Sequence, residues 1–195
     1  MTATFRASLI TLTLTALTLS GPSAQAAMPG MHHAATGTGA SDLGNLPHLQ
    51  GQAFDRAFLS MMVPHHQMAV DMARAALPLS RDATVKAWAT AVIRDQTREI
   101  TQMNSLLKGL GSNSAMANHM KGRMTGMADS VRKASNPDVA FVQGMLPHHA
   151  SAIDMANLAL QRGQDARVLT LARSIITAQA TEMLGFRTWL SKRGL

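Results

Sequence analysis

The sequence has no cysteine and no tyrosine, and aromatic residues make up 4% of its 195 residues. Without cysteine the chain forms no disulfide and no thiolate metal site. Binding of a soft metal ion would therefore depend on methionine and histidine, of which the chain has 15 and 8. The net charge of +7 comes from scattered Lys and Arg residues, without a basic run interleaved with aromatics. The composition therefore gives little support to nucleic-acid binding.

Long apolar runs are also missing, because no segment reaches the roughly 20 apolar residues that span a bilayer. The longest run, 7–19, follows Arg6 and is interrupted by four threonines. Ala24-Gln25-Ala26 then forms a small-x-small cleavage signal, and this order is typical of a secretory signal peptide. We expect residues 1–26 to be removed on export to the periplasm or the medium. The mature protein is expected to have no stable membrane insertion.

Residues 27–50 are rich in Gly, Ala, Ser and Thr and have no apolar periodicity, which predicts a flexible leader. The leader holds four side chains able to bind a metal: Met28, Met31, His32 and His33. They would form a weaker, mobile metal site, or they belong to a low-complexity tail without a role.

An internal duplication is the most informative feature of the chain. The segment 62–66, with sequence MVPHH, returns 83 residues later at 145–149 as MLPHH. The correspondence continues without a gap over roughly fifty positions, which indicates two copies of one structural unit. We expect the copies at about 55–108 and 138–192, joined by a connector at 109–136. Since neither copy looks complete, both are expected to share one core in a single domain at 51–195.

Apolar residues recur at steps of three and four in both copies, which predicts amphipathic helices. The stripes predict helices at about 55–77 and 82–108, and again at 138–161 and 165–192. No alternating strand pattern is present. Two helical hairpins of this length pack most simply as a four-helix bundle, so the expected fold class is all-α. Pro64 lies inside the first helix and is expected to kink it or to open a new one.

Each copy places adjacent histidines, methionines and carboxylates within reach of one another. The candidate ligands of an ordered metal site are His65, His66, His148, His149, Met62, Met72, Met145, Met155, Glu99 and Glu182. The expected hydrogen-bond partners around these ligands are Gln96, Gln179, Asp71 and Asp154. The candidates for weaker sites in the connector are Met116, His119, Met120, Met124 and Met127. A methionine-rich packing helix is the other interpretation of the connector.

Ligand softness decides which metal is expected. Thioethers favour Cu(I), imidazole suits Cu(I), Cu(II) and zinc, and carboxylates suit harder ions. Copper, as Cu(I) or Cu(II), is therefore the first choice and zinc the second. A ferritin-like di-iron centre would need two Glu-x-x-His motifs, which the chain lacks. No nucleophile with a base, phosphate loop or paired carboxylate is visible, so the sequence does not indicate an enzyme.

Two other interpretations stay open. A histidine on an apolar helix face is often a core residue bonded to a nearby glutamate. On that interpretation the chain is a structural or interaction bundle without a metal, and the His–Glu pairs tie its helices together. A metalloenzyme of unknown substrate is the second alternative.

The motifs resemble a known family. The first copy reads Phe58-x-x-Met61-Met62-Val63-Pro64-His65-His66, and the second copy repeats the pattern from Phe141 through Glu182. This pattern resembles the bacterial family called domain of unknown function 305. The resemblance implies a ferritin-like four-helix bundle, exported or membrane-tethered, and some relatives are associated with copper binding and copper tolerance. The motif histidines and methionines carry over to the eight His and Met candidates of the ordered site. Gly144 replaces the Met61 of the first copy, which predicts a second half-site poorer in thioethers.

Together these patterns predict an exported copper-binding protein that sequesters or chaperones copper in metal tolerance. Its partners would be the metal ion and a metal-transport or copper-accepting protein. A homo-oligomer is compatible with the pattern.

Overall fold

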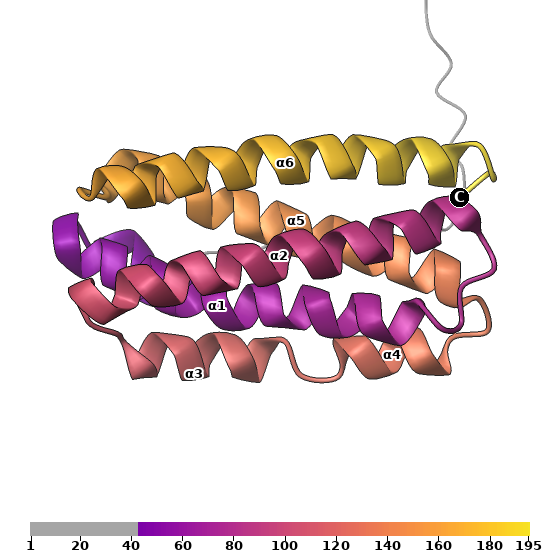
Figure 1. Ribbon diagram of the computed structural model, residues 1–195, viewed down its shortest axis with the longest axis horizontal. Coiled ribbons are helices and arrows are strands. Elements are labelled where there is room, and N and C mark those ends of the chain that lie inside the picture. The colour runs from indigo at the N-terminus through magenta and orange to yellow at the C-terminus, as the bar shows by residue number, and fades with distance from the viewer. Residues whose placement is uncertain (1–42) are drawn as a thin grey trace, which may run out of the picture. The chain divides into compact units, whose positions relative to one another are not determined.

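The computed structural model describes residues 43–195, and every regular element in that range is a helix. Four helices are long, namely α1 (Gly51–Ala76), α2 (Ala83–Leu110), α5 (Pro137–Arg162) and α6 (Ala166–Ser191). They form two hairpins, α1–α2 and α5–α6, as Figure 1 shows. Two short helices, α3 (Ser114–Arg123) and α4 (Met127–Lys133), lie between the hairpins in the chain, and a 3₁₀ turn, η2 (Leu46–His48), precedes α1. The predicted all-α bundle of two duplicated hairpins is confirmed.

Polar side chains begin the helices at four places. Asp82 and Asp165 accept hydrogen bonds from backbone N–H groups in the first turns of α2 and α6. Asn113 and Asn136 do the same for α3 and α5. The first N–H groups of a helix have no partner within it. By accepting them, these four side chains stabilise the start of each helix at its observed position.

Two aspartates connect the hairpins. Asp55 of α1 is buried and accepts the two backbone N–H groups that precede α6, at 2.9–3.2 Å. Asp138 of α5, the equivalent residue in the second copy, accepts the two N–H groups that precede α2, at 3.1 and 3.2 Å. The first helix of each hairpin therefore holds the turn of the other hairpin. We call Asp55 and Asp138 the turn clamps.

The connector is helical and packs along α1, where Figure 1 shows α3 and α4 in a line beside it. Met116 and Met120 of α3 and Val131 of α4 are buried against the bundle. The two short helices are separated by a turn at 124–126, in which Gly126 has φ +87°. The connector therefore adds a layer to the four-helix bundle over α1.

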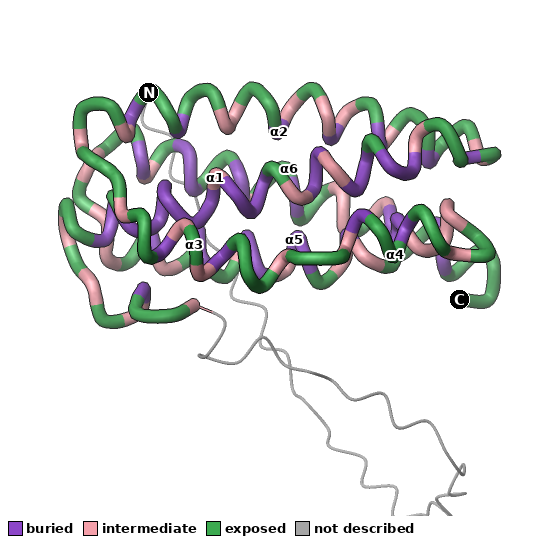
Figure 2. Tube along the Cα trace, turned by 90° about the horizontal axis from the view of Figure 1, so that it is seen from below, coloured by how far each residue is buried: buried purple, intermediate pink, exposed green. Residues whose placement is uncertain are grey.

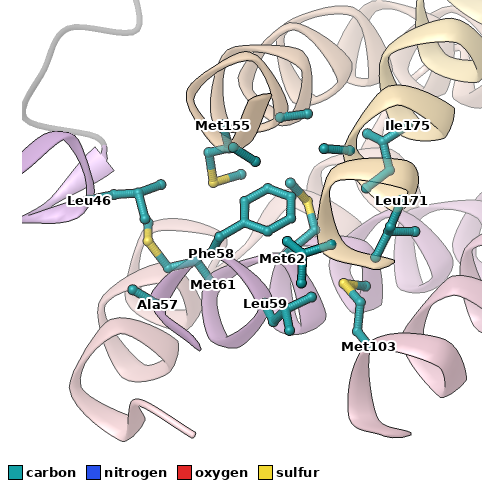
Figure 3. Packing of buried hydrophobic residues seen from close by; sticks show 14 of the residues in the cluster. Leu46, Ala57, Phe58, Leu59, Met61, Met62, Met103, Met155, Leu171 and Ile175 are labelled. Carbon is teal, nitrogen blue, oxygen red and sulfur yellow. The ribbon is translucent and has the colours of Figure 1, made fainter. Parts of the chain in front are cut away.

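The expected leader is described only from residue 43 onward. There Leu46 is fully buried, and Figure 3 shows it beside Met61 of α1. The last residues before α1 thus belong to the core, because Leu46 supplies an apolar side chain to it. The predicted signal peptide and the four metal-capable residues of the leader lie outside the described residues.

Both prolines of the duplicated motif lie inside continuous helices. Helix α1 runs from Gly51 to Ala76 through Pro64, and α5 runs through Pro147. Pro64 therefore does not open a new helix. Within residues 43–195, no helix is long and apolar enough to cross a membrane.

The core consists of two apolar clusters at opposite ends of α1. The first surrounds Phe58 and Met62, and Figure 3 shows these side chains directed toward Met155 of α5 and Leu171 and Ile175 of α6. The second surrounds residues 69–76 of α1, 141–145 of α5 and 186–190 of α6. In Figure 2 the buried residues lie on the helix faces that turn toward one another. The residues that separate the two clusters are polar.

Candidate metal centre

A buried polar layer lies between the two apolar clusters, and we call it the histidine layer. On α1 the histidines follow Met62 of the first cluster and precede Ala69 of the second. On the antiparallel α5 the order is reversed. The members of the layer are the buried His65, His66, Gln96, His148, His149 and Gln179 and the half-buried Glu99 and Glu182. Each residue of the first copy thus has its counterpart, and the duplication predicted from sequence brings both Pro-His-His motifs into one layer.

Each hairpin contains one histidine–glutamate pair. His66 Nε2 lies 2.8 Å from Glu99 Oε2, and His149 Nε2 lies 2.5 Å from Glu182 Oε2. These are the only two glutamates in the sequence. A carboxylate accepts, so the Nε2 atom carries the proton, and in the neutral ring Nδ1 keeps its lone pair. Both Nδ1 atoms are buried without a hydrogen-bond partner among the described residues. Each hairpin therefore has one oriented ring nitrogen, Nδ1, whose lone pair is unused.

The other two histidines meet across the hairpins. The ring centroids of His65 and His148 are 3.9 Å apart, with the rings tilted by 40°. His148 Nε2 donates to the backbone oxygen of His65 at 3.0 Å, so His148 Nδ1 also keeps its lone pair. His65 makes no reciprocal bond, and both its ring nitrogens are buried and unpartnered within the described part of the chain. A neutral imidazole has one N–H donor and one lone-pair acceptor, so burial of both without partners is unfavourable, and a metal ion would use the lone pair.

Burial also controls the charge of these two rings. Desolvation lowers the pKa of His65 well below its usual value, and repulsion from His148 and the other layer histidines lowers it further. Desolvation, with repulsion from His149 and His66, lowers the pKa of His148 to about 3. Both imidazoles are therefore neutral near pH 7. A neutral ring can bind a metal ion without first releasing a proton.

The two glutamines of the layer lie where the sequence predicted polar partners, but they do not bond to the histidines. Gln96 and Gln179 are buried, and neither the oxygen nor the nitrogen of either side-chain amide has a hydrogen-bond partner within residues 43–195. The layer therefore contains more polar groups than its own hydrogen bonds satisfy, which is unusual in a bundle core.

The aspartates predicted beside the histidines lie elsewhere. Asp71 is at the surface, where its side chain accepts from Gln67 at 3.0 Å and pairs with Arg74 at 3.9 Å. Asp154 is exposed. The prediction that these aspartates orient the imidazoles is wrong for Asp71, whose hydrogen bond and ion pair both lie along its own helix. Glu99 and Glu182, proposed from sequence as ligands, instead bond to Nε2 of His66 and His149.

The motif methionines are buried in the apolar clusters. Met62 and Met155 belong to the first cluster, and Met72 and Met145 belong to the second. The replacement of Met61 by Gly144 in the second copy has a packing reason. A Cβ at Gly144 would lie 2.7 Å from the terminal methyl of Met72, so the missing side chain makes room for this methionine. Packing thus accounts for these methionine positions without a metal ion.

A small cavity of ≈ 140 Å³ opens beside the layer, between the connector and α5. It is lined by Met120, Arg123, Met124, Met127, Pro147, His148 and Ser151. We call it the methionine cavity. Three of the five metal-capable connector residues thus lie next to a histidine of the ordered site, which sequence spacing could not reveal. Arg123 and Ser151 gave no signal in the sequence.

The other two connector residues, Met116 and His119, lie away from the methionine cavity. Met116 is buried in the first apolar cluster. His119 lies against Gly44, where a Cβ would be 3.4 Å from its ring, and its Nε2 is buried without a partner among the described residues. The predicted set of weaker connector sites is therefore divided into two places.

A larger cavity, ≈ 590 Å³, is a groove between α1, α2 and α3 that contains no histidine among its described lining residues. None of the residues that line it has a buried polar side-chain atom without a partner. The histidine layer, which has several, is therefore the better candidate for a functional site.

The donor set can be compared with what metal ions require. Within residues 43–195, no three histidine or carboxylate side chains come together as a preformed metal site. Structural zinc sites use four protein ligands, and catalytic zinc sites use three. Pairs of neutral imidazoles near thioethers suit a soft ion that accepts few ligands, which is the chemistry of Cu(I). These donor types are compatible with a soft monovalent ion such as Cu(I).

Comparisons with known proteins agree on one family and one helical fold. The family sequence model described as "Domain of unknown function (DUF305)" matches residues 9–107 and 138–195. CopM in the Cu(I)-bound form is 30% identical with a TM-score of 0.62, and the match covers 71% of this chain and 96% of CopM. CopM in the Cu(II)-bound form gives 31% identity and a TM-score of 0.64, over 74% and 98% of the two chains. These structures have the same helical fold.

Two further relatives match at lower identity or over a shorter segment. A DUF305 fragment from Deinococcus radiodurans has a TM-score of 0.61 at 22% identity, covering 71% of this chain and 95% of the fragment, and shows the fold alone. Uncharacterized protein L153 of Acanthamoeba polyphaga mimivirus is 39% identical over 61 residues, which are 30% of this chain and 40% of the viral protein.

Proposed function

Because the chain belongs to the DUF305 family, we propose that it is an exported copper-binding protein that sequesters or chaperones the ion. The similarity to CopM, solved with Cu(I) and Cu(II), supports copper as the ion. The signal-peptide pattern at residues 1–26 supports export. The partners would be copper itself and a protein that receives it. The function is binding and transfer, not catalysis.

The observation that carries the proposal is the state of His65. Its ring is fully buried, has no hydrogen bond from either nitrogen among the described residues, and lies 3.9 Å from the ring of His148. A histidine kept only for stability would be bonded to a neighbour. Copper bound by the layer histidines would use nitrogen lone pairs that otherwise remain unused. The glutamates would fix the outer rings through Nε2 and raise the basicity of Nδ1.

One observation favours the alternative of a structural bundle. His66–Glu99 joins α1 to α2, and His149–Glu182 joins α5 to α6, so each pair ties one hairpin together. This accounts for two histidines without a metal. It does not account for His65 or for the unpartnered Nδ1 atom of His148.

Titration with Cu(I) under anaerobic conditions tests the proposal. The protein competes with a chromophoric Cu(I) chelator, and retained copper is measured by elemental analysis. We expect the wild type to retain at least one equivalent. We expect His65→Leu/His148→Leu to lose tight binding while keeping its helical circular dichroism. His48→Gln, which removes an exposed imidazole outside the layer, is the matched control.

The melting temperature separates the two candidates. A ligand that binds only the folded state at a hundredfold excess over its Kd adds about 2.7 kcal/mol to the free energy of unfolding. A copper-binding protein therefore melts higher with Cu(I), and the double variant does not. If Cu(I) leaves the wild-type melting temperature unchanged and the double variant melts at a lower temperature than the wild type, the layer histidines serve the fold and the structural bundle is the correct function.

A further inference from the structure

The methionine cavity lies where an ion would have to pass to reach the buried histidines from the connector side. His148 lines the cavity although only 2% of its surface is exposed, and its Nδ1 has no hydrogen-bond partner within residues 43–195. Met120 of α3 is buried, whereas Met124 and Met127, on either side of the helix break, are half-buried. The thioethers thus extend from the partly exposed break toward the interior.

The lining chemistry selects the kind of ion. Three thioethers and one imidazole face the cavity, and no carboxylate of the described residues lines it. Thioethers bind Cu(I) and not hard or strongly hydrated divalent ions. The one charged residue in the described lining is Arg123, which is exposed.

We propose that Met120, Met124 and Met127 form the entrance through which Cu(I) reaches His148 and the histidine layer. This inference rests on the proposed function, and adds to it the route and the oxidation state of the ion. The ion first binds the thioethers at the helix break. A copper–sulfur bond then breaks as a bond forms to Nδ1 of His148. The oxidation state does not change, and no proton leaves, because Nε2 carries the proton and Nδ1 offers a lone pair.

The connector explains why such an entrance is needed. Helices α3 and α4 cover α1, so the histidine layer is closed by packed side chains on that side. The turn at 124–126 interrupts the cover next to the methionine cavity. Methionine suits this place because its flexible side chain can follow the ion without a change of charge.

Loading kinetics test the inference separately from affinity. The probe is the Cu(I) complex of bicinchoninate, whose colour is lost as the protein takes the ion, followed by stopped flow. Met120→Leu/Met124→Leu/Met127→Leu keeps apolar bulk and removes the sulfur atoms. We expect its loading rate to fall about tenfold, equivalent to roughly 1.4 kcal/mol in the barrier. The matched control, Met68→Leu/Met103→Leu/Met183→Leu, changes three methionines that do not line the cavity and is expected to load at the wild-type rate.

A second variant blocks the cavity without touching a ligand. Ser151 is buried and lines the cavity, so Ser151→Leu fills part of its volume. We expect slower loading and the same amount of copper retained at equilibrium. Excess Zn²⁺ should leave the wild-type loading rate unchanged.

The outcomes distinguish this inference from the proposed function. If both cavity variants load at the wild-type rate, the entrance is wrong and the proposed function stands. If the triple methionine variant loses retained copper as strongly as it loses rate, the thioethers are resident ligands and the entrance is again wrong. If the wild type retains no Cu(I), the proposed function fails, and the entrance fails with it.

Discussion

The turn clamps allow a quantitative prediction about stability, because the duplication supplies an internal control. Asp55 is 1% exposed, and its two oxygens hold the two backbone N–H groups before α6 at 2.9–3.2 Å. Hydrogen bonds to a charged group contribute about 1.5–3 kcal/mol each. The cost of burying the carboxylate offsets part of this gain. We therefore expect Asp55→Ala to lower the free energy of unfolding by about 3 kcal/mol.

Asp138 occupies the equivalent position and provides the comparison. It is half-buried and uses a single oxygen to accept its two N–H groups, at 3.1 and 3.2 Å. Water can replace this carboxylate more easily, so Asp138→Ala is expected to cost only about 1 kcal/mol. Gly163→Ala gives an independent measure of the Asp55 clamp, since its Cβ would lie 2.7 Å from Asp55 Oδ1 and 2.8 Å from a backbone oxygen.

Urea unfolding followed by circular dichroism measures these differences. The midpoint should fall in the order wild type, Asp138→Ala, Asp55→Ala, with an unchanged slope. Equal losses for the two aspartates, or a loss below about 1 kcal/mol for Asp55→Ala, would refute the reasoning that burial and the number of accepting oxygens determine the strength of a clamp. Copper retention should stay normal in folded samples of both variants, because neither aspartate belongs to the histidine layer.

Three further predictions concern the layer, the glycines and the glutamates. Because the folded-state pKa values of His65 and His148 are lowered, the unfolded chain takes up protons first as the pH falls below 6.5. Each of these two histidines should therefore lower the free energy of unfolding of the metal-free protein by roughly 1 kcal/mol for each pH unit below 6.5. For His148 this loss continues down to a pH of about 3, where the folded-state ring also takes up a proton. Urea titrations at several pH values should show a shallower loss for His65→Leu/His148→Leu. Gly109 lies inside α2, and a Cβ at this position would meet no other described atom within 4 Å, so Gly109→Ala should stabilise by about 0.5–1 kcal/mol. Gly126→Ala, at φ +87°, should lower the free energy of unfolding by about 1 kcal/mol. Thermal melts check both glycine variants. Glu99→Gln and Glu182→Gln should weaken Cu(I) affinity by about 10–100-fold in chelator competition, whereas Asp154→Asn should not.

Much of the fold followed from periodicity. Steps of three and four placed four long helices, and the 83-residue repeat paired them as two hairpins. The repeat also indicated that His65 and His148 belong to one core. The connector was predicted as helical only conditionally, because its stripe consists of methionines, which serve packing and metal binding equally well.

Details that depend on the direction of a side chain were not predictable. Asp71 follows His65 by six residues, which is about 240° around the helix, so it lies on another face. The sequence also does not show which ring nitrogen is bonded. That Asp55 clamps the distant hairpin, and that Met120 lies beside His148, depends on how α1, α3 and α5 pack together. Such contacts join residues that are far apart in the chain.

The reciprocal clamps have a consequence for how this architecture could arise. In a symmetric dimer, a residue of one subunit meets a group of the second subunit, and the reverse contact is identical. Asp55 and Asp138 follow this rule within a single chain. In a lone α1–α2 hairpin, the carboxylate of Asp55 and the N–H groups before α2 would have no partners. A second copy of the hairpin would supply partners for both. The present chain thus holds both hairpins in one polypeptide, and the connector between them covers α1 more than α5.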